Sequence, residues 1–378
     1  MKSLRTYKLK ITSDTTRFAE IAIAYRYAFN WLSPIVFAKG KPTTPNKLSN
    51  EFYGTVRANF GLPSQVTCSL FRHVVSTYRS MKTNGNWTLA ILKKTVVPLC
   101  WRRDFAISNR GTTIWGKPIT YHSRPLPEGK WSDSKLKCIN GQWYLCLVLE
   151  IDVLEPKTEG GVIGVDRGQK NVLTAFDSKT GKTLYVRGGP LNHRKLCIRQ
   201  TRAKVASVGT RSAHRLLQRL SGKEKSVTQE MMHVASKRLV TFAKECGARS
   251  IAMENLIGFK DKQTCENKKQ HHKQRARNNR WPYWMLDFFA SYKAAAIGIG
   301  TEYVPAKNTS RGCPKCGHVS KSNRNGLEFR CLSCQHQDNA DRNGAVNIAF
   351  RSLLQRQAVE ERAMCQLAYS SDESHGTN

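Results

Sequence analysis

The sequence predicts a multidomain protein of mixed α/β and β class, in which a β-rich domain precedes an α/β domain. Three observations support this fold class. The chain has 378 residues, more than twice the roughly 150 of an average domain. Strand-like segments dominate residues 84–158, whereas beyond Gly160-Gly161 short apolar strands alternate with long helical segments. Hydrophobic residues make up 40% of the chain and charged ones 24%, a balance that permits folded cores.

Helices interrupt the first domain. Apolar residues recur at helical spacing from Phe18 to Leu32 and again from Val66 to Tyr78. Farther on, Asn140-Gly141 separates two alternating segments, which is a strong signal for a two-residue hairpin turn. We therefore expect one wedge-like β domain made of residues 1–13 and 84–158, with a helical lobe inserted at 14–83.

The order of elements in the second domain is informative. The expected strands are 162–166, 171–176, 183–186, 250–253 and 301–304, and the expected helices are 191–247, 283–297 and 339–356. The first three strands form a meander, and a strand that follows a long helix can lie parallel to the first. Together with the late helix, this is the topology of an RNase H-like domain, which we place at residues 159–310 and 338–357. The polar tail, 358–378, is expected to be disordered.

The charge of the chain limits its partners. Lys and Arg total 62 against 27 Asp and Glu, which gives a net charge of +35. Such an excess repels itself unless a polyanion neutralises it, so nucleic acid is the expected partner and an anionic membrane surface the weaker alternative. No apolar run approaches the roughly 18 residues of a membrane-spanning helix, and the first residues lack the apolar core of a signal peptide. We therefore expect a soluble intracellular protein without a membrane partner.

Basic residues gather in two stretches, 191–225 and 258–282. A solvated helix face and a flexible loop would account for them, but the overall charge favours binding to phosphates. The expected nucleic-acid-binding residues are Arg211, Arg215, Arg219, Lys268, Lys269, Arg275, Arg277 and Arg280.

Two CxxC pairs predict a zinc site. Cys313 and Cys316 form the first pair, and Cys331 and Cys334 form the second. Fourteen residues, 317–330, separate the two pairs. Thiolates two residues apart on a tight turn can share one Zn²⁺, and two such turns complete a tetrahedron. Disulfides or idle thiols are the alternatives. We favour a zinc ribbon over residues 311–337, and because four thiolates close the coordination shell, its zinc is expected to be structural.

Three carboxylates point to a second metal site. Asp166 and Glu254 each end a short apolar strand, and the carboxyl ends of parallel strands lie together. Asp341 begins the helix that can pack back on this sheet. Acids that converge in a cationic protein indicate bound divalent cations, and two Mg²⁺ would clamp the attacking and leaving oxygens of a phosphodiester. On that helix we expect Asp338 to be the N-cap and Asp341 to be the ligand.

Several segments around these residues resemble a known protein family. The segments GVDRG (164–168), MENL (253–256), TSRGCPKCG (309–317), CLSC (331–334) and ADRNGAVNI (340–348) resemble the TnpB proteins of insertion sequences, relatives of the type V CRISPR nucleases. The resemblance covers residues 160–350, and the N-terminal half is similar only in layout. Two residues depart from the family pattern. Gln335 stands where Gly is usual, and Gly344 stands where Ala is usual, at a cost of about 1 kcal/mol in helix propensity.

The resemblance implies an activity. In that family a RuvC-like nuclease domain uses two strand acids and one helix acid, which match Asp166, Glu254 and Asp341. It implies an RNA-guided DNA endonuclease that cuts double-stranded target DNA beside a short adjacent motif, with a guide RNA derived from the transposon end. Mg²⁺ would be the catalytic cofactor and Zn²⁺ the structural one. The expected setting is the bacterial or archaeal cytoplasm, in association with the nucleoid.

Other functions remain open at this point. A guide-dependent DNA-binding protein or repressor without cleavage is one, although all three acids are present. A miniature CRISPR effector with the same chemistry is another, and a guide-independent transposase is the third. A monomer is favoured over an oligomer.

Overall fold

The computed structural model describes residues 2–94, 96–108, 111–122, 126, 129–256 and 283–372. It divides into two compact units: one comprises Lys2–Asp152, and the other starts at Val153, shortly before the Gly160-Gly161 pair.

The first unit contains a five-stranded antiparallel sheet in the order β2-β7-β8-β1-β6. Its strands are β1 (Lys2–Ile11), β2 (Val96–Leu99), β6 (Tyr121–His122), β7 (Lys130–Ile139) and β8 (Gln142–Asp152). A smaller sheet consists of β3 (Phe105–Ser108), β4 (Gly111–Ile114) and β5 (Lys117–Ile119). The predicted hairpin is confirmed, because Asn140 (φ 51°) and Gly141 (φ 79°) join β7 to β8 with both residues in the left-handed region.

Three helices lie between β1 and β2 in the sequence. They are α1 (Thr16–Ala38), α2 (Pro45–Phe60) and α3 (Ser64–Thr83). The apolar residues that recur at helical spacing in the sequence form the buried faces of α1 and α3. Tyr25, Phe29 and Leu32 of α1 and Val66 and Tyr78 of α3 share one core with the large sheet.

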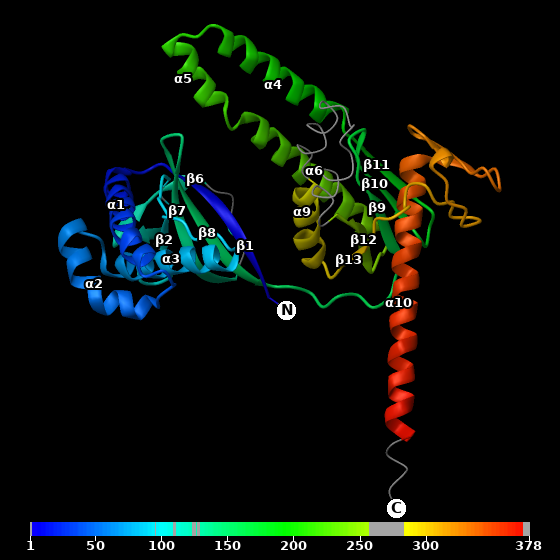
Figure 1. Cartoon of the computed structure of the whole chain (residues 1–378), viewed down its shortest axis with the longest axis horizontal. Coiled ribbons are helices and arrows are strands. Elements are labelled where there is room, and N and C mark those ends of the chain that lie inside the picture. Colours follow the sequence, from blue (N-terminus) through cyan, green and yellow to red (C-terminus); the bar gives the residue numbers. More distant parts are fainter. Residues whose placement is uncertain are drawn as a thin grey trace, which may run out of the picture. The chain divides into compact units, whose positions relative to one another are not determined.

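The second unit is built on the sheet β11-β10-β9-β12-β13, shown in Figure 1. Its strands are β9 (Val162–Asp166), β10 (Asn171–Asp177), β11 (Thr183–Arg187), β12 (Ser250–Asn255) and β13 (Gly300–Pro305). The first three form an antiparallel meander, and β12 runs parallel to both β9 and β13. The predicted RNase H-like strand order is therefore confirmed.

Alternate residues of β9 and β12 face different layers. Ile163, Val165 and Ile251 pack with α6 (Lys223–Glu245) and α9 (Tyr283–Ala295), whereas Val162 and Ala252 pack with α10 (Ala340–Asp372) on the other face. Gly164 allows α10 to cross β9 closely, because a Cβ at this position would lie 2.1 Å from the carbonyl oxygen of Ala345.

The helical stretch predicted over 191–247 is confirmed, and the structure divides it into three helices: α4 (Gly189–Ser207), α5 (Arg211–Leu220) and α6. The first break falls at Gly209, whose φ is +68°, and the Thr210 hydroxyl then caps α5 by accepting from the Ala213 amide at 3.2 Å. The second break falls at Gly222. Figure 1 shows α4 running antiparallel to α5 and α6.

The tail also differs from the expectation. Helix α10 continues to Asp372, beyond the predicted helix end at residue 356. Residues 351–372 contain neither Gly nor Pro and are rich in good helix formers, so nothing in this segment stops the helix.

No helix in the described part of the chain is long and apolar enough to cross a membrane.

The cysteine-rich insertion forms a small sheet of its own. It contains the 3₁₀ turn η1 (Lys321–Asn323), followed by β14 (Arg324–Asn325), β15 (Glu328–Arg330) and β16 (Gln337–Asn339) in the order β14-β15-β16. Strand β16 leads directly into α10.

Candidate active site and cysteine cluster

The structure brings the three predicted acids together. Asp166 is the last residue of β9, and Glu254 follows Met253, which pairs with Val165 in the parallel register of β12 and β9. Asp341, in the first turn of α10, is only 6% exposed. Burial, and then the charges of Glu254 and Asp341, raise the pKa of Asp166 to about 7. Glu254 and Asp341 thus lie close enough to Asp166 to disfavour its negative charge.

Polar neighbours hold two of these carboxylates. The Asn171 side-chain amide donates to Asp341 at 2.9 Å, and Arg324 pairs with the other oxygen of Asp341 at 3.0 Å. The hydroxyl of Thr309 donates to Oε1 of Glu254. Arg324 also opposes the rise in the pKa of Asp166. The cysteine-rich insertion therefore contributes a cation to the acid site through β14.

A buried arginine lies beneath the site. Arg167 is 5% exposed, pairs with Asp287 on α9, and donates to the backbone carbonyl oxygen of Glu254. This arrangement ties β9, β12 and α9 together at the edge where Asp166 and Glu254 lie.

Sequence reasoning missed Arg167, Arg324, Thr309 and Asn171. Two of them carried a signal, since Arg167 belongs to the GVDRG segment and Thr309 to TSRGCPKCG. For Arg324 and Asn171 the sequence offers no such sign, because their partner Asp341 is distant along the chain.

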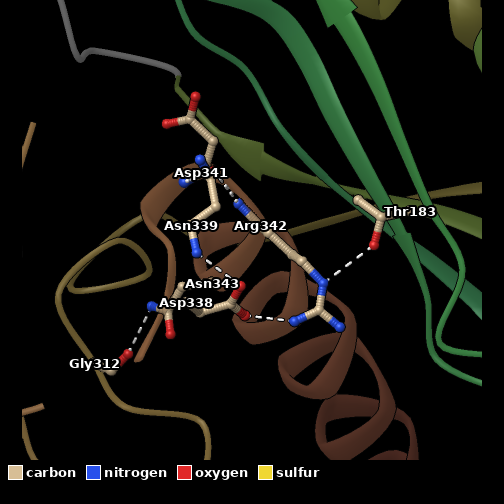
Figure 2. A network of polar contacts seen from close by, with 7 residues as sticks. All are labelled: Thr183, Gly312, Asp338, Asn339, Asp341, Arg342 and Asn343. Atoms are coloured by element: carbon tan, nitrogen blue, oxygen red, sulfur yellow. Dashed lines mark hydrogen bonds and ion pairs between the residues drawn. The ribbon is translucent and has the colours of Figure 1, made fainter. Parts of the chain in front are cut away.

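The start of α10 corrects one prediction. The N-cap is Asn339 and not Asp338: Oδ1 of Asn339 accepts from the amides of Asp341 at 3.0 Å and Arg342 at 3.2 Å. Asp338 instead pairs with Arg342, which also donates to the Thr183 hydroxyl at 3.2 Å. Figure 2 shows this network, with the Asp341 carboxylate directed away from the Asp338–Arg342 pair. The helix starts one residue later than expected, so the cap moves with it.

The structure explains why glycine stands at position 344. A Cβ at this position would lie 3.1 Å from Cγ of Asp166, tighter than most such contacts. The glycine that lowers the helix propensity of α10 therefore leaves room for the carboxylate.

The four predicted cysteines form one cluster. Their sulfur atoms all lie within 4.8 Å of one another, and Sγ of Cys313 is 3.5 Å from Sγ of Cys334. Four sulfurs about 2.3 Å from a tetrahedral zinc ion would be about 3.8 Å apart, so the cluster fits a metal ion such as zinc. Backbone amides, that of Cys334 foremost, lower the pKa of Cys331, which favours the thiolate form that binds metal.

The two CxxC turns have the same geometry. The amide of Gly317 donates to the Cys313 carbonyl at 2.9 Å, and the amide of Gln335 donates to the Cys331 carbonyl at 3.1 Å. Both residues are left-handed, with φ of 75° and 57°. Gln335 therefore occupies a conformation that favours glycine, which is why Gly is usual there.

The cluster is fastened to α10. The side-chain amides of Asn343 and Asn347 donate to the Gly312 carbonyl at 3.0 Å and 2.8 Å. Gly312 precedes Cys313, so these bonds connect the first CxxC turn to the helix that carries Asp341.

The predicted basic residues divide into two groups. Arg211, Arg215 and Arg219 are exposed on α5, four residues apart. Lys268, Lys269, Arg275, Arg277 and Arg280 lie outside the described residues.

Comparison with known proteins agrees with the resemblance that the sequence motifs show. Residues 283–348 match the family "Cas12f1-like, TNB domain". The chain is 30% identical over 231 residues to the CRISPR-associated endodeoxyribonuclease Cas12f2 of Micrarchaeota archaeon (strain CG1_02_47_40), covering 58% of this chain and 42% of that protein. It is 28% identical over 189 residues to the TnpB-like protein MJ0751 of Methanocaldococcus jannaschii, covering 48% of this chain and 66% of that protein.

A solved structure, a Cas12f1–sgRNA–target DNA complex, aligns with 92% of this chain and 99% of its own, at 17% identity and a TM-score of 0.42. The chain spans less than half the length of the Cas12f2 relative and about two thirds of the TnpB-like one. This chain is a relative of the TnpB-like and Cas12f proteins, as its sequence motifs predict.

Proposed function

We propose that this protein is an RNA-guided DNA endonuclease whose active site consists of Asp166, Glu254 and Asp341. The observation that carries the proposal is the convergence of these acids at one edge of an RNase H-like sheet, in a chain of charge +35. The relatives include a protein named as an endodeoxyribonuclease, which supports cleavage of DNA. Guide RNA from a transposon end, an adjacent motif in the target and Mg²⁺ dependence are parts of this proposal.

The donor set suits Mg²⁺. Three carboxylates supply the oxygen ligands that this cation prefers. Burial and the charges of Glu254 and Asp341 raise the pKa of Asp166, and a bound cation would favour its ionised form. When bound, Mg²⁺ would activate a water nucleophile and stabilise the leaving oxygen of a phosphodiester.

The other residues of the site position its acids. Asn171 and Arg324 fix both oxygens of Asp341, and Thr309 fixes one oxygen of Glu254. Arg167 donates to the backbone carbonyl oxygen of Glu254 and so holds the backbone at this residue. Charge-assisted bonds of this kind would keep the carboxylates of Asp341 and Glu254 oriented before substrate arrives.

We also propose that the cysteine cluster binds structural zinc and that the α5 arginines track phosphates. The cluster secures the start of α10 through Gly312, so its metal would keep Asp341 in register with the sheet. The first unit would hold guide RNA and read the adjacent motif, as the family layout implies.

The test separates cleavage from binding. Asp166→Ala and Glu254→Ala should each abolish cleavage of target DNA in the presence of Mg²⁺, while binding of RNA and target stays at the wild-type level. Sequencing of the RNA that copurifies with the wild-type protein should return one defined guide. Cutting by either variant would remove that residue from the active site, and a random RNA population would favour a guide-independent transposase.

A further inference from the structure

Helix α9 exposes aromatic side chains close to the acid site. Trp284 is 63% exposed and Phe288 is 61% exposed, although both are large apolar residues. Their spacing of four residues places them on one face of the helix, and Tyr292 continues that face. We call Trp284, Phe288 and Tyr292 the aromatic stripe.

The stripe rests on a fixed support. The Phe288 ring lies 5.9 Å from the ring of Phe289 and 5.8 Å from that of Tyr292, between centroids. Phe289 is buried and stacks on His233 of α6 at 3.7 Å, with an angle of 11° between the planes. Because Phe289 belongs to the core and Tyr292 packs against it, the Phe288 ring rests on an ordered surface and has less freedom to lose when it binds a partner.

Cations accompany the stripe. Nζ of Lys293 lies 5.9 Å from the centre of the Tyr292 ring and donates to the His233 carbonyl at 2.8 Å. Lys237, exposed on α6, is close enough that its charge adds to burial in lowering the pKa of Lys293. A rigid aromatic face with adjacent lysines suits an anionic, ring-containing partner.

The stripe starts where α9 is fastened to the acid site. Asp287, between Trp284 and Phe288 in the sequence, pairs with Arg167, the residue next to Asp166. The Arg167 guanidinium also lies 6.0 Å from the ring centre of Tyr283, which directly precedes Trp284. A strand that follows the stripe toward its N-terminal end is therefore led to the carboxylates.

We propose that the aromatic stripe is a stacking platform for the bases of single-stranded DNA on its way to Asp166, Glu254 and Asp341. This inference rests on the proposed function. Aromatic rings beside cations bind single strands without sequence preference, because every base has a face that can stack.

A second copy of the chain would cover the same face less well. Two chains of charge +35 repel each other, whereas a polyanion is attracted. Lysines are also depleted from the cores of protein–protein interfaces.

The experiment measures binding of a fluorescein-labelled oligothymidine to the full chain without added Mg²⁺, so that no cleavage is required and any zinc in the cysteine cluster stays bound. Salt is kept high enough to screen the basic surfaces. The double variant Trp284→Ala/Phe288→Ala should raise Kd at least about fivefold, the loss expected for one stacked base. The slope of log Kd against log salt should stay unchanged, because no cation is removed. Trp284→Tyr/Phe288→Tyr retains the rings and should bind within about twofold of wild type.

Phe350→Ala is the matched control, since Phe350 is 43% exposed on α10, outside the stripe. It should bind like wild type. The inference is overturned if the double variant binds within twofold of wild type. It is also overturned if light scattering shows a wild-type dimer that the double variant dissociates while single-strand binding persists. Wild-type protein that binds oligothymidine but never cuts DNA with Mg²⁺ would refute the proposed function alone, and the binding comparison would still decide the role of the stripe.

Discussion

Asp338 and Asp341 lie within one helical turn of each other and have different surroundings. Asp338 is held by Arg342, whereas the Asp341 carboxylate is fixed by Asn171 and Arg324 and helps to raise the pKa of Asp166. The sequence identifies Asp341 through its motif, but the cap at Asn339 depends on where β16 ends, which the local pattern does not define.

The two aspartates should therefore separate stability from cleavage. Asp338→Ala leaves Arg342 without its partner and should lower the free energy of unfolding by about 1 kcal/mol while cleavage persists. Asp341→Ala should abolish cleavage with stability close to wild type, since the lost pair with Arg324 is offset by weaker repulsion among the acids. Thermal unfolding and DNA cleavage of both variants test this, and the reverse pattern would move the third ligand to Asp338.

The raised pKa of Asp166 predicts a pH-dependent stability. Its ordinary pKa is 3.8 and its folded value is about 7, so between these values the folded chain holds a proton that the unfolded chain has released. The Asp166 contribution therefore destabilises the fold increasingly as pH rises from about 4 to about 7. Without divalent cations, Asp166→Asn should stabilise the protein at pH 8 by up to about 4 kcal/mol and should have little effect at pH 4.

Thermal unfolding without added Mg²⁺ at several pH values measures this difference. Asp177→Asn is the contrast, because Asp177 is buried but accepts hydrogen bonds from the amide and hydroxyl of Thr180 at 2.9 Å and 2.6 Å. That variant should destabilise the protein at pH 8. If Asp166→Asn does the same, Asp166 does not carry an unbalanced charge.

At the scale of elements, the sequence was most informative where one local rule decides the outcome. The alternation of short apolar strands with helical segments, together with the acids at two strand ends, predicted the sheet of the second unit. Asn140-Gly141 predicted the β7–β8 hairpin. The helical stretch 191–247 was predicted without its breaks, because helix-forming residues continue past Gly209 and Gly222, and only the positive φ at Gly209 and the cap at Thr210 show the first break. The pairs Arg324–Asp341 and Arg167–Asp287 join distant elements, so no local pattern could reveal them.

The cysteine cluster and α10 should behave as one element. Cys313→Ser removes a ligand, so bound zinc should fall from about one per chain to near zero and the small sheet should lose order. Cleavage should weaken because Gly312 and Arg324 no longer hold the start of α10. Elemental analysis and cleavage assays check both effects, with the exposed Cys138→Ser as the control. Wild-type protein without stoichiometric zinc would contradict the assignment of this site.

Over the whole molecule, the excess of positive charge should raise the affinity for nucleic acid and make that affinity depend on salt. Each phosphate that a lysine or arginine neutralises releases counterions, so binding weakens as salt rises. The exposed arginines of α5 lie on one face of a helix, an arrangement that can follow a phosphate backbone without reading its bases.

Replacing Arg211, Arg215 and Arg219 together by Gln should weaken nucleic-acid binding equally for all sequences. The slope of log K against log salt should become shallower by up to about 2.7 for duplex DNA, or about 0.9 for each lost contact. Binding titrations at several salt concentrations measure the slope, and Gln218→Ala on the same helix is the uncharged control. An unchanged slope would show that this face is merely solvated.

Arg324 gives the two metal sites a common thermodynamics. It belongs to the small sheet of the cysteine cluster, yet its guanidinium lies on Asp341 and acts on Asp166. If both sites hold the proposed metals, any order that the cluster metal imparts to β14 would change the affinity of the acids for their cation. Linkage is reciprocal: the factor by which zinc alters the dissociation constant of magnesium would be the factor by which magnesium alters that of zinc. Under the proposed function, occupancy of the cysteine cluster would in this sense be an allosteric variable of the acid site.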